Sequence, residues 1–103
     1  MKNTNKFKAK IFSALADPVR LEILEYLRSG EKCVCEITPH AGIAQSLVSR
    51  HLAILKRCGL IKVRKQVNRR FYSVMDPAIF HVIDAVTVDL MDALTKRVIE
   101  QIV

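Results

Sequence analysis

The sequence contains no long hydrophobic run and few residues that interrupt regular structure. Charged residues break every apolar stretch before about 18 residues. The first ten residues, MKNTNKFKAK, include no apolar segment of the kind that a secretory signal peptide requires. We therefore expect a cytoplasmic protein with no membrane span. Because no internal repeat, low-complexity tract or Gly/Ser linker is present, a single domain over residues 1–103 is predicted.

Carboxylates are absent from the middle of the chain. Residues 37–75 carry eight Lys or Arg and no Asp or Glu, whereas residues 1–36 have a charge of +2 and residues 76–103 a charge of −3, within a net charge of +7. A solvated surface usually mixes charges of both signs. An acid-free block of this length therefore favours a polyanionic partner.

The small size of the chain limits what it can build. A domain of 103 residues buries only about two-thirds of its unfolded surface, so a partner subunit is a natural way to bury more. A deep catalytic pocket would strain such a core, and we expect no enzyme. In the cytoplasm, three cysteines, two of them in Cys33-Val34-Cys35, indicate metal or thiol chemistry rather than a disulfide framework.

The hydrophobic pattern predicts four helices, a β-hairpin and a long final helix. Asp17-Pro18 and Asp76-Pro77 each have the residue types of a helix N-cap followed by the first helical position. The predicted segments are a helix capped by Asn5 and running to about Ala16, helices from Pro18 to the stop at Ser29-Gly30, from Cys35 or later to Gly42 and from Gln45 to Cys58, strands in 60–74, and a helix from Pro77 to Ile102. In the hairpin turn, Asn68 is expected to take a positive φ. This order predicts a mainly α fold with a β-hairpin wing, a winged helix-turn-helix.

The helix over 45–58 has the pattern of a DNA-reading helix. Val48, Leu52, Leu55 and Cys58 form a core stripe, while another face is small and polar at its start and basic further on. A solvated helix face is the plain alternative, but the short preceding helix and the basic hairpin favour DNA. The predicted DNA-binding residues are Gln45, Ser46, Ser49, Arg50 and Arg57 on the helix, and Arg64, Lys65, Arg69 and Arg70 on the wing beside Lys62.

The first and last helices are predicted to form a homodimer. The last helix carries an apolar surface wider than the short first helix can cover with Phe7, Ile11 and Leu15. Its apolar residues are Ile79, Val82, Ile83, Val86, Leu90, Leu94, Val98 and Ile102. Burial against a two-fold mate is the simplest solution.

Cys33 and Cys35 are candidate metal ligands. Residues two apart on a regular helix point about 200° apart, so both thiols can face one ion only if the helix begins at or after Cys35. Pro39 and the restricted Thr38 before it favour such a late start. Soft thiolates select As(III), Sb(III), Cd(II), Pb(II) or Hg(II). Two small buried hydrophobic residues are the alternative; Cys58 is either a packing residue or the third ligand.

Four separated motifs resemble the arsenic repressor family, ArsR/SmtB. They are LADPVRLEIL at 15–24, CVCEI at 33–37, QSLVSRHL at 45–52 and LKRCGLI at 55–61. The resemblance implies homodimeric transcriptional repressors that leave operator DNA when a metal or metalloid binds. It also implies the recognition-helix role for Gln45, Ser46, Ser49 and Arg50, and the metal-box role for Cys33 and Cys35.

The chain departs from the family pattern at three places. Thr38 stands where arsenic-sensing members typically have a third cysteine, and the wing turn lacks the usual glycine. On the last helix His81 has Asp84 and Asp89 nearby but no second histidine follows, so no zinc site is expected there.

Three functions remain open on the sequence. The favoured one is a dimeric repressor that responds to As(III), Sb(III) or another soft metal through cysteine thiolates. A second keeps DNA binding and makes Cys33 and Cys35 a redox switch. The third, a small thiol oxidoreductase, rests on the Cys-x-Cys motif alone and lacks a nearby general base.

Overall fold

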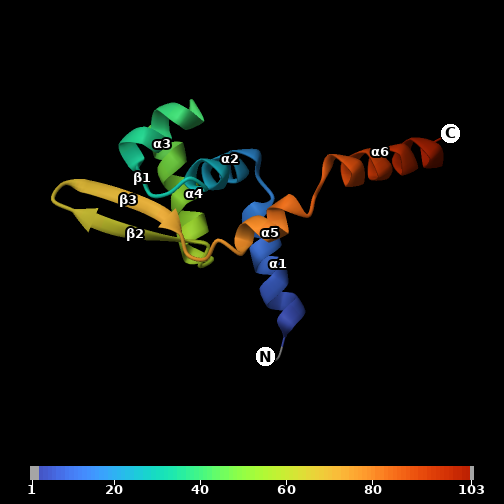
Figure 1. Ribbon diagram of the computed structural model, residues 1–103, viewed down its shortest axis with the longest axis horizontal. Helices are drawn as coiled ribbons and strands as arrows, with labels where there is room; N and C mark the ends of the chain where they lie inside the picture. Colours follow the sequence, from blue (N-terminus) through green and yellow to red (C-terminus); the bar gives the residue numbers. More distant parts are fainter. Residues whose placement is uncertain (1–2, 103) are drawn as a thin grey trace.

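The computed structural model describes residues 3–102, which form six helices and a small three-stranded sheet whose β2–β3 hairpin extends from one end of the molecule (Figure 1). The elements are α1 (Thr4–Leu15), α2 (Pro18–Leu27), β1 (Lys32–Cys33), α3 (Val34–Ala41), α4 (Gln45–Arg57), β2 (Ile61–Gln66), β3 (Arg69–Val74), α5 (Ile79–Asp84) and α6 (Val88–Ile102). This is the predicted winged helix-turn-helix, mainly helical with a β-hairpin wing. The helix and strand order was thus predicted correctly up to residue 74, apart from the short strand β1.

The core lies where α2, α3 and α4 meet the sheet. Leu24 of α2 and Val48 and Leu55 of α4 are fully buried, and Ile37 of α3 is 1% exposed. The start of α2 follows the expected cap, because Asp17 Oδ1 accepts hydrogen bonds from the backbone N–H groups of Val19 (2.8 Å) and Arg20 (3.1 Å). Asn5 was predicted to cap the first helix, but α1 begins at Thr4, so Asn5 lies inside it; the N-cap residue is Asn3, whose side chain makes no capping hydrogen bond.

The sheet contains one strand that was not expected and a turn that differs from the prediction. The two-residue strand β1 pairs with β3, so the strand order is β1-β3-β2, all antiparallel. Gln66 pairs with Arg69, which leaves Val67 and Asn68 as a two-residue loop. Val67 has the positive φ, 54°, so the prediction of Asn68 was wrong. Two-residue hairpin loops place a positive φ at their first residue, whatever its preference.

The predicted final helix is two helices. Helix α5 ends at Asp84 with Ala85 as its C-cap, and α6 begins at Val88. Thr87 Oγ1 accepts a hydrogen bond from the backbone N–H of Leu90 (3.1 Å) in the first turn of α6. This cap starts a new helix axis, so α6 points away from the body of the domain (Figure 1). The correction matters for assembly, because α6 has no buried residue.

Helix α6 gives the subunit an extended shape, with principal dimensions of 58 × 37 × 23 Å. Large apolar side chains remain exposed along it, among them Leu94 (55%), Val98 (54%) and Ile102 (79%). In residues 3–102, no helix has the length and apolarity that crossing a membrane requires.

Candidate DNA-binding surface and thiol pair

Helix α4 presents two different faces. Val48, Leu52 and Leu55 point into the core and are at most 1% exposed. The predicted DNA-reading side chains lie on the opposite, exposed side: Gln45, Ser46, Ser49, Arg50 and Arg57. The core stripe thereby fixes which side of the helix faces solvent. Cys58, the predicted fourth member of the stripe, is the C-cap residue and only half-buried.

The helix-turn-helix consists of α3, a turn and α4. Gly42 ends α3 with φ 69° and ψ 22°, the left-handed conformation that glycine adopts without steric cost. Ala44 precedes the first turn of α4 and offers no side-chain cap. No side chain of the N-cap residue therefore covers the first amide groups of α4, beside Gln45 and Ser46.

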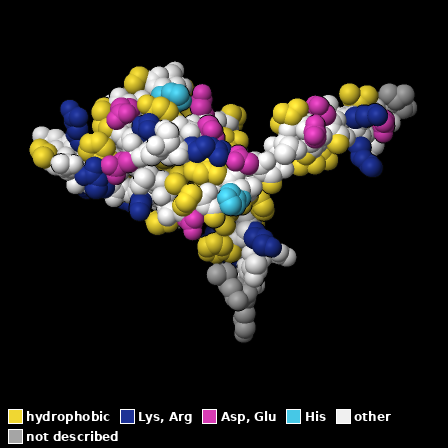
Figure 2. All heavy atoms as spheres, viewed as in Figure 1, with side chains coloured by type: hydrophobic (Ala, Val, Ile, Leu, Met, Phe, Trp, Pro, Cys, Tyr) yellow, Lys and Arg dark blue, Asp and Glu magenta, His cyan; other side chains and the backbone are white. Residues whose placement is uncertain are grey.

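The wing adds exposed cations to the same side of the domain. Figure 2 shows Lys and Arg side chains around the β2–β3 hairpin. Lys65, Arg69 and Arg70 are exposed, and within residues 3–102 their side chains form no hydrogen bond or ion pair. Unpaired cations of this kind are free to meet phosphate.

Arg64 is different from the other wing cations. Its Nη2 lies 2.7 Å from Glu31 Oε1 and its Nε donates to Glu31 Oε2 at 3.1 Å. This hydrogen-bonded pair lowers the pKa of Glu31 and raises that of Arg64. Sequence analysis assigned Arg64 to phosphate binding and missed Glu31, which lies 33 residues earlier in the chain.

A polar hollow of about 240 Å³ joins the reading helix to the wing. Its lining combines Gln45 and Ser49 of α4 with Arg70 and Tyr72 of β3, together with Val34 and Asn68. The structure thus brings predicted residues from both elements to one concave surface. Tyr72 and Asn68 were not predicted to belong to it, because only the hairpin register shows that they face α4.

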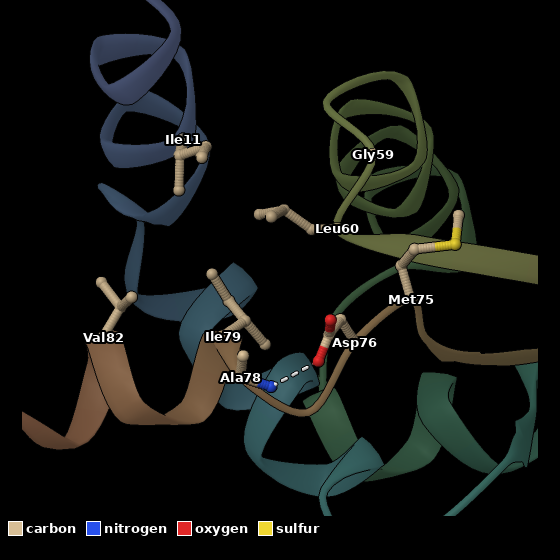
Figure 3. Close-up of a pocket in the computed structure, with 8 residues that line it drawn as sticks. All are labelled: Ile11, Gly59, Leu60, Met75, Asp76, Ala78, Ile79 and Val82. Atoms are coloured by element: carbon tan, nitrogen blue, oxygen red, sulfur yellow. Dashed lines mark hydrogen bonds between the residues drawn. The ribbon is translucent and has the colours of Figure 1, made fainter. Parts of the chain in front are cut away.

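Two further hollows near α1 and α5 are apolar. Figure 3 shows the first, of about 240 Å³, where Ile11 of α1 faces Ile79 and Val82 of α5 and Leu60 points in from the side. Its one charged lining residue, Asp76, accepts a hydrogen bond from the backbone N–H of Ala78 (2.9 Å). The second, of about 360 Å³, lies between α1 and the start of α6 and includes Phe12 and Met91. These surfaces offer apolar contact.

The two cysteines of the Cys-x-Cys motif lie at the start of α3. Cys33 is the N-cap in extended conformation, with φ −70° and ψ 147°, and its Sγ accepts the backbone N–H of Cys35 at 3.1 Å. Glu36 completes the capping box, since its Oε1 accepts the N–H of Cys33 at 3.3 Å. The two sulfurs are joined as a disulfide, with the Cα atoms 5.1 Å apart. Cys33 is buried (2% exposed) and Cys35 is exposed.

The two sulfurs can meet because Cys33 lies outside helix α3, much as predicted from a late helix start. Helix α3 begins at Val34, one residue earlier than expected, and continues through Pro39. The geometry still works because Cys33 lies outside the helix, so the angle of about 200° between residues two apart on a helix does not apply. A thiolate at a helix N-cap is also stabilised by the amide groups that point toward it.

The chemistry of this donor pair fits a soft ion through two thiolates. A third ligand is not supplied nearby: residues 3–102 contain no group of three or more His, Cys, Asp or Glu side chains arranged to hold a metal. Cys58 packs against the core, and His40 stacks on Tyr26 with ring centroids 3.9 Å apart. Among the described residues, neither side chain therefore completes a three-ligand group with the pair.

Comparison with known proteins agrees with this arrangement. Residues 17–63 match the family described as "Bacterial regulatory protein, arsR family". The solved structure of Rv0081 from Mycobacterium tuberculosis is 31% identical, covers 95% of this chain and 99% of its own, and has a TM-score of 0.77. The chain belongs to the ArsR/SmtB family. Its members are transcriptional regulators, so the chain is a DNA-binding regulator and not an enzyme.

Two other proteins are similar over shorter stretches. A Streptomyces lividans protein named "Probable mercury resistance operon repressor" is 44% identical over 71 residues, which span 69% of this chain and 57% of the relative. A homodimeric winged helix-turn-helix domain, Mb0332 from Mycobacterium bovis, is 27% identical with a TM-score of 0.76, covering 85% of this chain and 84% of its own.

Proposed function

We propose that the protein is a cytoplasmic, homodimeric repressor that leaves operator DNA when As(III), Sb(III) or another thiophilic metal binds Cys33 and Cys35. One observation carries this proposal: the two sulfurs converge at the N-cap of the helix that precedes the reading helix. The mercury-resistance name of the Streptomyces relative supports a thiophilic effector.

DNA would be read by α4 and held by the wing. Gln45, Ser46, Ser49 and Arg50 are proposed to contact base edges or nearby phosphates, and Arg57, Lys65, Arg69 and Arg70 phosphates. A two-fold dimer through α1 and α6 would present two reading helices, so the expected target is an inverted repeat. The exposed apolar side chains of α6 and the homodimeric Mb0332 support this assembly.

Binding of arsenite would change the start of α3. As(OH)₃ exchanges two hydroxides for the two sulfurs, and the thiol protons leave with them as two waters. An arsenic atom between the sulfurs would hold them farther apart than the direct bond that joins them here, and Cys33 Sγ is also the acceptor of the Cys35 N–H. The start of α3 must therefore adjust, and α3 packs on α4. A coupling of about 1–3 kcal/mol is expected.

The test is DNA binding by the reduced protein with and without arsenite. Fluorescence anisotropy on a sequence selected by the protein from random DNA should show release on titration with As(III). Cys33→Ser should keep DNA affinity and lose the release, while Cys58→Ser should keep both. Normal arsenite sensitivity in Cys33→Ser would contradict the assignment of the metal site.

A second candidate, a redox-responsive repressor, is favoured by the disulfide between Cys33 and Cys35. Peroxide would take two electrons and two protons from the thiols and become two waters. DNA release by peroxide that dithiothreitol reverses, without a response to arsenite, would select this function over the first.

A further inference from the structure

The thiol pair and the DNA-binding wing share one sheet. Phe71 of β3 pairs with Cys33 of β1 on one side and with Arg64 of β2 on the other. Cys33, Phe71 and Arg64 therefore form one row across the three strands. Side chains also connect the row, because the Arg64 guanidinium lies 4.6 Å from the centroid of the Phe71 ring. These contacts connect β1 to Arg64 through Phe71.

Every nitrogen of the Arg64 guanidinium has a partner within the subunit. Nε and Nη2 bind the two carboxylate oxygens of Glu31 at 3.1 and 2.7 Å, and Nη1 lies 2.7 Å from Gln66 Oε1. A forked contact of this kind cannot be made to a carboxylate and a phosphate with the same nitrogens. While the pair is closed, the Nε–Nη2 edge of Arg64 is occupied and cannot make a forked contact with a DNA phosphate.

Glu31 connects the pair to the thiol chemistry. It lies two residues before Cys33, at the entry to β1, and in the structure the closed Glu31–Arg64 pair coexists with joined sulfurs. We propose that Glu31 is a positioning residue that withholds Arg64 from a DNA phosphate, and that ligand binding at Cys33 and Cys35 strengthens this hold. The inference rests on the proposed function and adds a second route by which ligand binding lowers DNA affinity, through the wing as well as through α3 and α4.

The consequence is a change in how many phosphates the protein binds. With the thiols free, β1 can move and Arg64 can turn to DNA. With the thiols bound to one ion, Glu31 keeps Arg64, and each subunit binds one phosphate fewer. The slope of log affinity against log salt should then become shallower by about 0.9 per subunit, or about 1.8 for a dimer.

The experiment compares Glu31→Gln with a matched control, Glu22→Gln. Glu22 is an exposed carboxylate of α2 that forms no hydrogen bond or ion pair with another residue in 3–102. Coupling typically changes affinity about 5- to 150-fold, and Glu31→Gln should reduce the arsenite-induced decrease in DNA affinity by about threefold or more. Arsenite-bound Glu31→Gln should also have the steeper salt slope. Glu22→Gln should change neither quantity.

A second variant separates the pair from other roles of Glu31. In an Arg64→Gln background, Glu31→Gln should have no further effect on the arsenite response, because the pair is already broken. An equal effect with and without Arg64 would overturn the proposal. So would an arsenite response of Glu31→Gln equal to that of the unmodified protein.

The Glu31–Arg64 pair can be tested separately if the proposed function fails. If the protein does not respond to arsenite, the Glu31–Arg64 pair is tested in the free protein by nitrogen-15 NMR of the Arg64 side-chain Nε–H. Its proton should exchange slowly and become fast in Glu31→Gln but not in Glu22→Gln. Equal rates of proton exchange at the Arg64 Nε–H in all three proteins would show that Glu31 does not position Arg64, and would overturn the proposal.

Discussion

Arg28 of α2 and Asp84 at the end of α5 form a two-pronged ion pair. Arg28 Nη1 lies 2.9 Å from Asp84 Oδ2, and Nη2 lies 2.8 Å from Asp84 Oδ1. The same guanidinium binds Glu25 and lies 4.3 Å from the centroid of the Phe80 ring. Helix α5 is therefore attached to the body of the domain, whereas α6, which follows the break, is not.

Breaking this attachment should loosen α5 and leave the DNA-reading surface intact. Asp84→Asn is expected to lower the melting temperature and to speed amide exchange in α5, because the charged partner of Arg28 is removed. Asp92→Asn, on exposed α6, is the matched control and should change neither. Unchanged exchange in α5 of Asp84→Asn would show that the Phe80 contact alone holds the helix.

Acid should destabilise the protein through its hydrogen-bonded carboxylates. Hydrogen bonds from Arg28 lower the pKa of Asp84, and the backbone N–H of Arg20 leads the groups that lower the pKa of Asp17, both from 3.8. Because the pKa of each carboxyl group is lower in the folded state than in the unfolded state, the ionised group stabilises the fold above about pH 4. This stabilisation is lost as the pH falls through the lowered pKa. Urea unfolding of the unmodified protein and of Asp84→Asn between pH 5 and pH 2 measures this loss of stability. The free energy of unfolding of the variant should depend less steeply on pH.

The wing turn provides a test of backbone conformation. Val67 is 94% exposed and has φ 54°, a conformation that costs a β-branched residue about 1–2 kcal/mol. Val67→Gly should therefore raise the free energy of unfolding, whereas Asn68→Gly should not. Greater stabilisation by Asn68→Gly in urea titrations would show that the positive φ lies at residue 68.

The exposed face of α6 should control assembly. Leu94 is 55% exposed in the subunit, and Leu94→Asp would place a charge in an apolar dimer contact, so we expect a monomer in analytical ultracentrifugation. Lys96→Asp changes a neighbouring residue and should remain a dimer if Lys96 lies outside the contact. A Leu94→Asp dimer would contradict the proposed role of α6.

Sequence analysis predicted correctly the elements whose sequence signals come from residues close together in the chain. The stripe of Val48, Leu52 and Leu55 and the Asp17 cap predicted α4 and α2 because both depend on residues within a few turns. The break in the last helix was missed because apolar spacing continues from Val82 through Val86 to Leu90. Thr87, with Asp89 in the following turn, is a cap signal that could have indicated it.

Features that depend on distant pairing could not be predicted in this way. Strand β1 exists because Lys32 and Cys33 pair with Tyr72 and Phe71, and two residues carry no strand pattern of their own. The Glu31–Arg64 pair likewise joins separate parts of the chain. For the thiols, the sequence predicted that Cys33 and Cys35 could converge, and their role as ligands stays a prediction.

The shortness of β1 has a consequence for how quickly the thiols can be reached. A strand of two residues at the edge of a sheet is held by few hydrogen bonds, so it can detach while the core of Leu24, Val48 and Leu55 stays folded. Buried Cys33 would then become accessible through local opening, at a small fraction of the free energy of global unfolding. The rate at which a ligand is captured would thus be governed by the fluctuations of this edge, independently of the lifetime of the fold.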